Sequence, residues 1–142
     1  MSEEFPSLFR YFMWSSLMRE YFDQALANSG TKLDDQDGFL FFSTKPGIFM
    51  TYWYGGLYVV IEGWQELGLH EPVIDELLQS PNVDLLRRFR NGAFHFQNAW
   101  LDDRLVAFCG AAGSVSWVRA LTQRFHDYLT GEMHRRYGSA RA

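Results

Sequence analysis

The chain has 142 residues, of which 47% are hydrophobic and 21% are charged, a balance that excludes a disordered or fibrous protein and fits one globular domain. Its formal net charge is -4, so a protein that is basic overall and coats nucleic acid is excluded, and any contact with nucleic acid must be local. Aromatic residues make up 18% of the chain, more than one small core needs, and we expect some of them to face a partner.

The expected setting of the chain is the cytoplasm. Its single cysteine, Cys109, cannot form an internal disulfide, and no charged-then-apolar signal segment opens the sequence. The most apolar stretch, residues 48–61, has 14 residues, whereas a membrane span needs about 20. We therefore expect this stretch to be core, with no membrane as a partner.

A first helix is predicted to begin at Ser7, directly after Pro6, and to end at residues 28–30. Its apolar positions recur at helical spacing and include Phe9, Phe12, Met13, Leu17, Tyr21 and Ala25. Residues 31–38, which are polar and acidic, are predicted to form a linker, because their aspartates do not have the spacing of a calcium loop.

A second helix is predicted over residues 44–68, because Pro46 suits a first turn and apolar residues keep one helical face up to Gly68. Residues 52–61 also fit two strands joined by a turn at Gly55 and Gly56, and this alternative stays open. The helix is favoured because the periodicity continues across the glycines, although each costs a helix about 1 kcal/mol.

The second half of the chain is also predicted to be mostly helical. Pro72 opens a short helix, and Pro81 precedes a longer one over residues 82–96. A small hairpin or irregular loop is expected near residues 97–113. Ser114 or Ser116 is expected to cap a last helix, followed by a polar tail from about residue 134. The chain, residues 1–142, is thus predicted to be a single all-α domain.

The densest polar cluster of the sequence lies on the helix predicted over residues 82–96, where Arg87, Arg88, Arg90, Asn91 and His95 interrupt an apolar segment. An ideal helix places Leu86, Phe89, Ala93 and Phe96 on the buried side, with Arg88, Asn91 and His95 on the far side. Arg90 and His95 would lie about 140° apart around this helix. A shared pocket therefore needs the reach of the arginine, a distortion at Gly92 or a second subunit.

Arg90, four intervening residues and then His95, with Asn91 directly after the arginine, resemble the motif of HEPN-domain proteins. The resemblance implies a bundle of four to five helices that forms a homodimer. Many HEPN proteins are ribonucleases that need no metal and act in toxin–antitoxin, antiviral or RNA-processing systems. The resemblance therefore implies an RNA substrate, and an antitoxin protein as partner if the chain is a toxin.

Cleaving RNA without a metal requires removal of the 2′-hydroxyl proton and stabilisation of a crowded anionic phosphate. Histidine titrates near neutrality, and arginine offers a permanent fork of donors. We accordingly expect His95 to be the general base or acid, Arg90 to stabilise the phosphate and Asn91 to be an orienting or a substrate-binding amide. Arg87, Arg88 and Gln97 are expected to bind the substrate. By analogy with the family, the products are a 2′,3′-cyclic phosphate and a 5′-hydroxyl.

Further residues are candidates for supporting this site. Glu62 ends an apolar run and can pair with Arg90, or can simply reach solvent at the edge of its helix. Tyr54 and Tyr58 can present hydroxyls to the cleft, although core packing is favoured for both.

No cofactor or metal is expected, because the four histidines and the single cysteine lack the spacing of a zinc site and no P-loop is present. The arginines and His95 also fit an ordinary solvated helix face. The functional alternative to a ribonuclease is a module without catalysis that binds a protein or a nucleotide.

Overall fold

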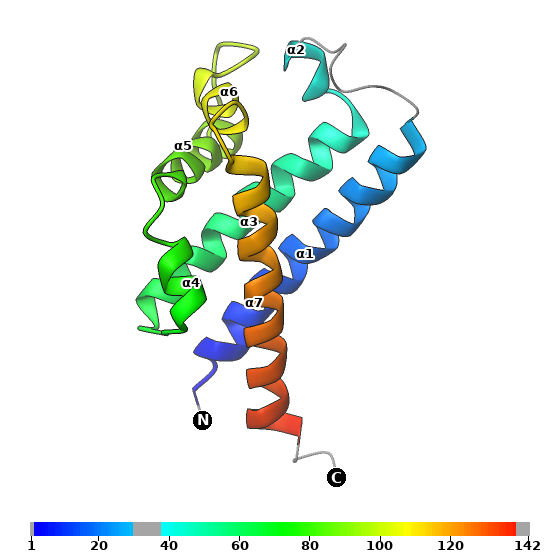
Figure 1. Ribbon diagram of the computed structural model, residues 1–142. Helices are drawn as coiled ribbons and strands as arrows, with labels where there is room; N and C mark the ends of the chain where they lie inside the picture. The colour runs from blue at the N-terminus through cyan, green and yellow to red at the C-terminus, as the bar shows by residue number, and fades with distance from the viewer. Residues whose placement is uncertain (1, 30–37, 139–142) are drawn as a thin grey trace.

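The computed structural model describes residues 2–29 and 38–138, and within these ranges every regular element is a helix (Figure 1). The predicted all-α class is therefore confirmed. Residues 31–37 of the predicted linker lie outside the described residues, and Gly38 begins the short helix α2, Gly38–Phe41.

Two long antiparallel helices, α1 (Glu4–Ser29) and α3 (Lys45–Glu66), form the centre of the fold (Figure 1). Ser15 of α1 lies against Gly56 of α3, where a Cβ would come within 3.1 Å of the Ser15 Cβ. The Ser15 hydroxyl donates a 2.8 Å hydrogen bond to the carbonyl oxygen of Trp53. The glycine therefore allows the two helices to approach closely, and residues 52–61 form a helix instead of the alternative hairpin.

The beginning of α3 follows the prediction. Thr44 is the N-cap, its hydroxyl accepts a 3.1 Å hydrogen bond from the amide of Gly47, and Pro46 lies in the first turn.

The side of α1 that faces the core matches the periodic apolar positions of the sequence only in part. The buried residues of α1 are Phe5, Leu8, Phe12, Ser15 and Phe22, whereas Met13, Leu17 and Tyr21 are exposed. Because α1 carries apolar residues on both sides, its periodicity alone does not select the side that packs. The helix also begins at Glu4, earlier than the expected start at Ser7.

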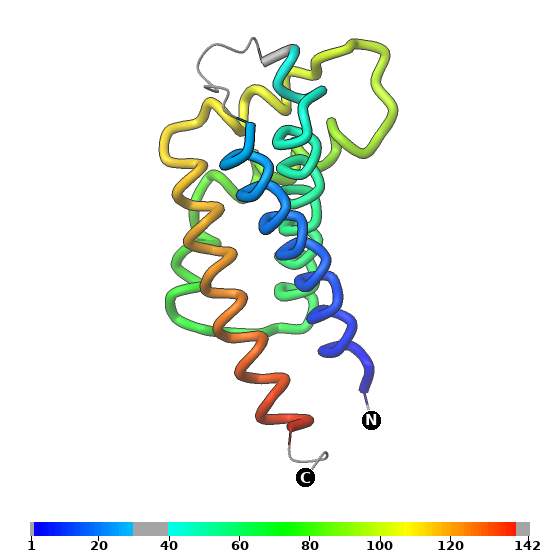
Figure 2. Tube along the Cα trace, turned by 90° about the vertical axis from the view of Figure 1, so that its right-hand side faces the viewer, coloured from blue at the N-terminus to red at the C-terminus, as the bar shows by residue number. Residues whose placement is uncertain are grey.

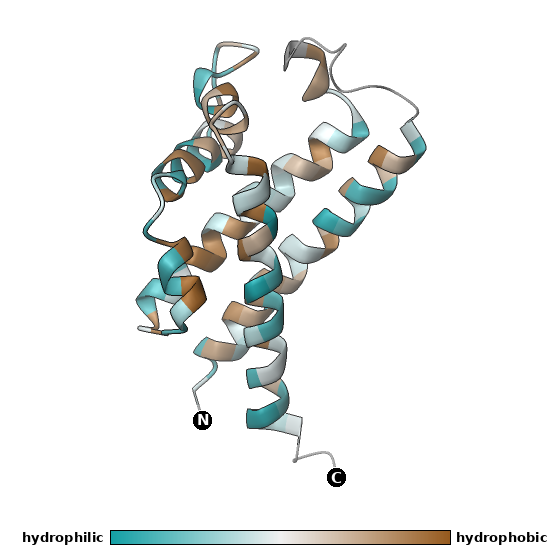
Figure 3. Cartoon of the chain, in the orientation of Figure 1, coloured by the Kyte–Doolittle hydropathy of each residue, from teal (hydrophilic) through white to brown (hydrophobic). Residues whose placement is uncertain are grey.

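Helix α7 (Ser114–Tyr137) crosses in front of α1 and α3 in Figure 1. Trp53 of α3 donates from Nε1 to the Thr122 hydroxyl of α7 at 3.2 Å, and Asp23 of α1 pairs with Arg119 of α7 at 2.7 Å. The N-cap of α7 is Gly113, with φ of +72°, and not one of the predicted serines. The helix continues to Tyr137, so the described part of the predicted polar tail is helical, and polar residues colour much of its outward side teal (Figure 3).

The remaining helices are α4 (Pro72–Leu77), α5 (Asn82–Phe94) and α6 (Asp103–Cys109). Of the small hairpin or irregular loop expected near residues 97–113, the described residues contain only the loop, up to residue 102, because residues 103–109 form a helix that buries Leu105 and Phe108. Asp102 caps this helix by accepting a 2.9 Å hydrogen bond from the Arg104 amide. Residues 95–102 are irregular and stand away from the body, on the opposite side of α3 from α7 (Figure 2).

Among the described residues, no single helix is long and apolar enough to cross a membrane; α6 and α7 together meet the length and composition but are bent by 79°. The one cysteine, Cys109, packs against the core, and burial raises the pKa of its thiol to about 11.

Candidate functional site

Arg90, near the end of α5, is held from three directions. Its Nη1 donates to Oε1 of Glu62 on α3 at 2.6 Å, so the predicted pairing of these two residues is present. Its Nε and Nη2 donate to Oδ1 of Asn91 at 3.2 and 3.1 Å. The guanidinium carbon also lies 4.8 Å from the centre of the Tyr58 ring. The position of the guanidinium is thus defined by α3 as well as by its own helix.

Tyr58 responds to the same surroundings. Its pKa is raised first by burial and then by the negative charge of Glu62, while Arg90 acts in the opposite direction. The hydroxyl therefore stays protonated well beyond neutral pH and remains a hydrogen-bond donor beside the arginine. Tyr58 was one of the two tyrosines that could face the cleft, with core packing favoured; its contact with Arg90, one helical turn before Glu62, was not expected.

His95 lies just beyond the end of α5, because the helix stops at Phe94 and His95 has extended backbone angles (φ -113°, ψ 132°). Its side chain is exposed. The same helix end corrects the predicted buried stripe: Leu86 and Phe89 are fully buried, whereas Phe96 is 93% exposed. A helix that continued to residue 96 would bury Phe96, but α5 ends at Phe94.

Arg90 and His95 line two different hollows, which share the side chain of Phe94. Arg90 borders an apolar hollow of about 340 Å³ between α1 and α3. His95 borders a hollow of about 470 Å³ that also includes Gln97, Phe96 and Trp100. Within one chain, the structure therefore places the two motif residues on either side of the Phe94 ring and not in one pocket.

Gln97 and Asn91 contact the two motif residues directly. The Gln97 side chain donates from Nε2 to the carbonyl oxygen of His95 at 3.0 Å and lines the same hollow as His95. Asn91 uses its side-chain oxygen to hold Arg90. Its amide therefore positions the guanidinium and does not lie in either hollow.

Arg87 and Arg88 lie outside both hollows. They share the carboxylate of Asp84, at 2.7 Å from Arg87 Nη2 and 3.0 Å from Arg88 Nε. The hydrogen bond from Arg87 is the main cause that lowers the pKa of Asp84. Two arginines and one aspartate leave one positive charge on this exposed surface of α5, which is a weaker basic patch than the arginines alone indicate.

Tyr54 is buried, and its ring packs against Trp53, Phe89 and Phe108. Burial is the largest cause that raises the pKa of its hydroxyl. The structure places Tyr54 in the core, which was the alternative to a role in the cleft.

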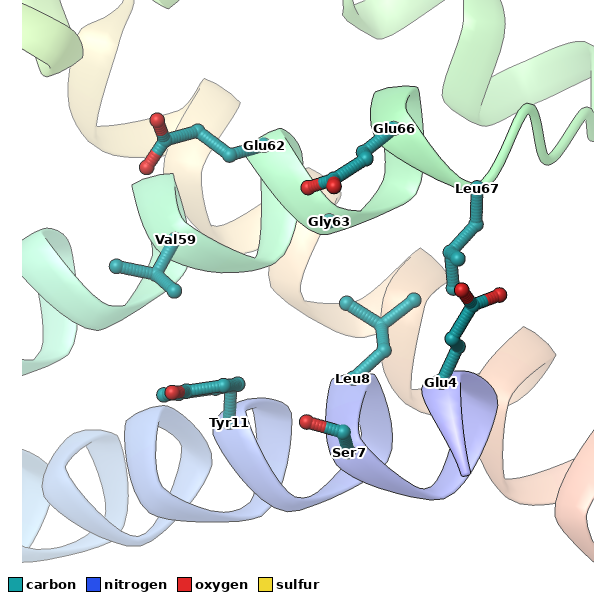
Figure 4. A pocket seen from close by; sticks show the side chains of 9 residues that line it. All are labelled: Glu4, Ser7, Leu8, Tyr11, Val59, Glu62, Gly63, Glu66 and Leu67. Atoms are coloured by element: carbon teal, nitrogen blue, oxygen red, sulfur yellow. The ribbon is translucent and has the colours of Figure 1, made fainter. Parts of the chain in front are cut away.

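A third hollow, of about 330 Å³, continues along the groove between α1 and α3 and is acidic (Figure 4). Glu4 of α1 and Glu66 of α3 line it, and so does Glu62, whose carboxylate points away from α1 toward the side of Arg90. Within the described residues no group of three or more His, Cys, Asp or Glu side chains is arranged to hold a metal ion.

The surface around the motif is rich in exposed aromatic rings. The sequence indicated only that the chain has more aromatic residues than one small core needs. Phe94, Phe96 and Trp100 are exposed around His95, and Tyr52 packs edge-on against Phe94 with ring centres 5.2 Å apart. Their exposure depends on where α5 ends and on the path of residues 95–102, and no periodic pattern shows either.

Comparison with known proteins adds no relative: no family model, no curated protein and no solved structure matches this chain.

Proposed function

We propose that this chain is a metal-independent endoribonuclease of the HEPN type, a toxin or defence component, in which Arg90 stabilises the reacting phosphate and His95 transfers protons. The observation that carries the proposal is the guanidinium of Arg90, which Glu62, Asn91 and Tyr58 hold in a defined position on the helix that ends just before the exposed His95. An arginine has five N–H donors, and the contacts to Glu62 and Asn91 use three of them. Two donors therefore remain for phosphate oxygens.

In the proposed reaction, the 2′-oxygen of a ribose attacks the adjacent phosphorus. The O2′–P bond forms while the P–O5′ bond breaks, which leaves a 2′,3′-cyclic phosphate and a 5′-hydroxyl. One group takes the proton from the 2′-hydroxyl and another supplies a proton to the 5′-oxygen. His95 performs one of these transfers, and Arg90 balances the charge that develops on the phosphate.

A second copy of the chain supplies what one chain lacks in this proposal. Arg90 and His95 of one chain lie on either side of Phe94, and one histidine cannot at once remove one proton and donate another. A homodimer provides two histidines and two arginines. An antitoxin protein, if the chain is a toxin, would act by covering the surface that carries Arg90 and His95.

The exposed rings of Phe96 and Trp100 support an RNA substrate with unpaired bases. Both border the hollow that contains His95 and Gln97. Bases of single-stranded RNA stack on such rings, and the attraction does not depend on a basic surface. This suits a chain with a net charge of -4 and a small local excess of positive charge.

The test is cleavage of a mixed single-stranded RNA pool in EDTA by the purified protein. We expect His95→Ala and Arg90→Lys to abolish cleavage without loss of helical content. Lysine lacks the planar fork of N–H donors with which Arg90 binds Glu62 and Asn91 at the same time. Matched controls are His70→Ala and Arg124→Lys, which change exposed residues outside the site. Products that end in a 2′,3′-cyclic phosphate are expected. Equal activity in wild type and His95→Ala would overturn the proposal.

The exposed aromatic surface also favours a second candidate, a non-catalytic module that binds a protein or a nucleotide. A protein that is inert on RNA, binds one protein tightly and does so equally well as His95→Ala would establish this candidate instead. Thermal stabilisation by nucleotides, without any by RNA, would point to the nucleotide-binding form.

A further inference from the structure

Helices α1 and α3 each carry a second apolar stripe, most of which is exposed, with Met18 partly buried against the core. On α1 it consists of Tyr11, Trp14, Met18 and Tyr21, at steps of three and four residues. On α3 it consists of Ile48, Tyr52 and Val59, and the small Gly55 and Gly56 lie between the last two. This spacing is the one by which helices pack against further helices. We call the residues of these two stripes the α1/α3 face.

The α1/α3 face is one continuous surface. The apolar hollow is lined by Tyr11, Trp14 and Met18 from α1 and by Tyr52 and Val59 from α3. Further along, the Tyr21 ring lies 5.4 Å from the ring of Phe49. Helix α7 packs on the other side of α1 and α3, where Trp53 and Asp23 contact it.

The amount of exposed apolar surface is large for so small a chain. Trp14 is 56% exposed and Tyr52 is 54% exposed, while Tyr11, Tyr21 and the adjoining Phe94 of α5 are each exposed by more than a third. Since an aromatic side chain buries roughly 150–250 Å² when covered, these five rings offer on the order of 500 Å². A stable interface needs about 800 Å² from each partner, which these rings and their neighbours together approach.

The two ends of the α1/α3 face carry opposite charges. Glu4 and Glu66 lie at one end, beside the acidic hollow (Figure 4). Lys45, three residues before Ile48 on the same stripe of α3, is exposed at the other end. If two copies met with their helices parallel, the acidic ends would face each other. If one copy is turned end over end, Lys45 of each copy meets the acidic end of the other.

From this arrangement we propose that the α1/α3 face binds a second copy of this chain, related by a two-fold axis perpendicular to the helices, so that α1 runs antiparallel to its counterpart. Such an interface is self-complementary in shape and in charge, as a two-fold contact requires. It buries the aromatic rings at its centre, where Arg10 lies over the rings of Tyr11 and Trp14 at 5.1 and 5.0 Å, and leaves Lys45, Glu4 and Glu66 at its rim.

This inference deepens the proposed function, on which it rests for the role of the dimer in catalysis, by naming the surface through which the two copies meet. Arg90 and Phe94 border the hollow at the centre of the α1/α3 face, so a second copy seated there reaches the motif. The association itself follows from the surface alone, so it is measured independently of RNA cleavage.

The first test is the mass of the purified chain by size-exclusion chromatography with light scattering over a range of concentrations. We expect a wild-type dimer, with twice the 16.6 kDa of the chain, and a rise of at least about tenfold in Kd for Trp14→Glu. The matched control is Val115→Glu on α7, which changes a residue with nearly the same exposure, 55%, outside the α1/α3 face. This control should remain a dimer, and circular dichroism should show unchanged helical content in both variants.

The second test examines the antiparallel order. Lys45→Glu and Glu66→Lys should each weaken the dimer, and the chain that carries both changes should recover it, because each copy then again presents opposite charges at the two ends. Neither single change opposes the dipole of α3, so the fold should tolerate both.

A wild-type monomer, a dimer unaffected by Trp14→Glu, or an equal loss in Val115→Glu would overturn the proposal. A double variant no better than the single ones would overturn the antiparallel order. Cleavage of RNA in EDTA, measured on the same samples, separates the two conclusions. A dimer with the expected response and no cleavage contradicts the ribonuclease, whereas cleavage by a monomer contradicts the interface.

Discussion

The ring of Phe94 lies so close to Gly55 that a Cβ on the glycine would be 2.2 Å from Cε2 of the ring. This contact explains why a helix former is absent from the middle of α3. The ring leans on the bare backbone of α3 and forms the wall between the hollow of Arg90 and the hollow of His95. The geometry of the motif therefore depends on a residue that carries no side chain.

Gly55→Ala should displace the Phe94 ring and lower the free energy of unfolding by about 1 kcal/mol, because the clash outweighs the better helix propensity of alanine. In a Phe94→Ala background the clash is gone, and the same change should stabilise the protein by up to about 1 kcal/mol. Urea denaturation of the four proteins of this double-mutant cycle measures the coupling. Additive effects would show that the ring does not rest on Gly55.

Thr122→Val should cost about 1–3 kcal/mol of unfolding free energy, because it leaves the buried Nε1–H of Trp53 without its acceptor. Thr122→Ser is the matched control, since it keeps the hydroxyl and removes only a methyl group. Thermal or urea unfolding of both variants gives the comparison. If serine costs as much as valine, packing and not the hydrogen bond determines the loss.

The pair between Asp23 and Arg119 should make the stability depend on acid pH. The hydrogen bond from Arg119 is the largest cause that holds the pKa of Asp23 below its usual value of 3.8 in the folded protein. The stabilisation is therefore fully present above that value and is lost as the pH falls through the lower folded pKa. Because both side chains are more than a third exposed, the gain at neutral pH is at most about 1 kcal/mol.

The measurement is urea unfolding of wild type and Asp23→Asn from pH 7 down to pH 2. The two proteins should differ at pH 7 and converge toward the acid end of the series. A difference that is the same at every pH would mean that the charge of Asp23 plays no part.

Phe96→Ala should weaken binding of a single-stranded RNA that carries 2′-O-methyl groups and cannot be cleaved. Loss of one base stacked on an aromatic ring corresponds to about 1–3 kcal/mol, or roughly a 5- to 150-fold rise in Kd. The fold should be unaffected, because the ring is 93% exposed. Val115→Ala serves as the control, and fluorescence anisotropy is the readout. Equal affinity in wild type and Phe96→Ala would exclude this ring from RNA binding.

The helical class and most helix positions were predictable from local chemistry. Thr44 with Pro46 indicates the start of α3, and Pro72 indicates the start of α4. The threonine hydroxyl accepts a hydrogen bond from a first-turn amide, and a proline in the first turn has no amide hydrogen to leave unpaired. The end of α5 was placed two residues too late, since Phe96 continues the apolar pattern although the helix stops at Phe94. Helix α6 was missed because seven residues give too short a pattern to separate a helix from a strand.

The pairing of Glu62 with Arg90 could be predicted because a carboxylate at the end of an apolar run needs a partner if it is buried. The arginines of α5 are suitable cationic partners. The contact of Arg90 with Tyr58 and the separation of Arg90 from His95 by Phe94 could not. They depend on how α5 lies across α3 and on the backbone turn at His95, and both are properties of packing.

The sequence by itself determined that this protein is an all-α domain and that Arg90, Asn91 and His95 share one short segment, because helix propensity, caps and motif spacing are local. Only the tertiary structure decided which of the two apolar stripes of α1 is core and which remains on the surface. A stripe is buried only when another element covers it. In this fold α7 covers one side of α1 and α3, and the α1/α3 face on the other side stays exposed beside the motif.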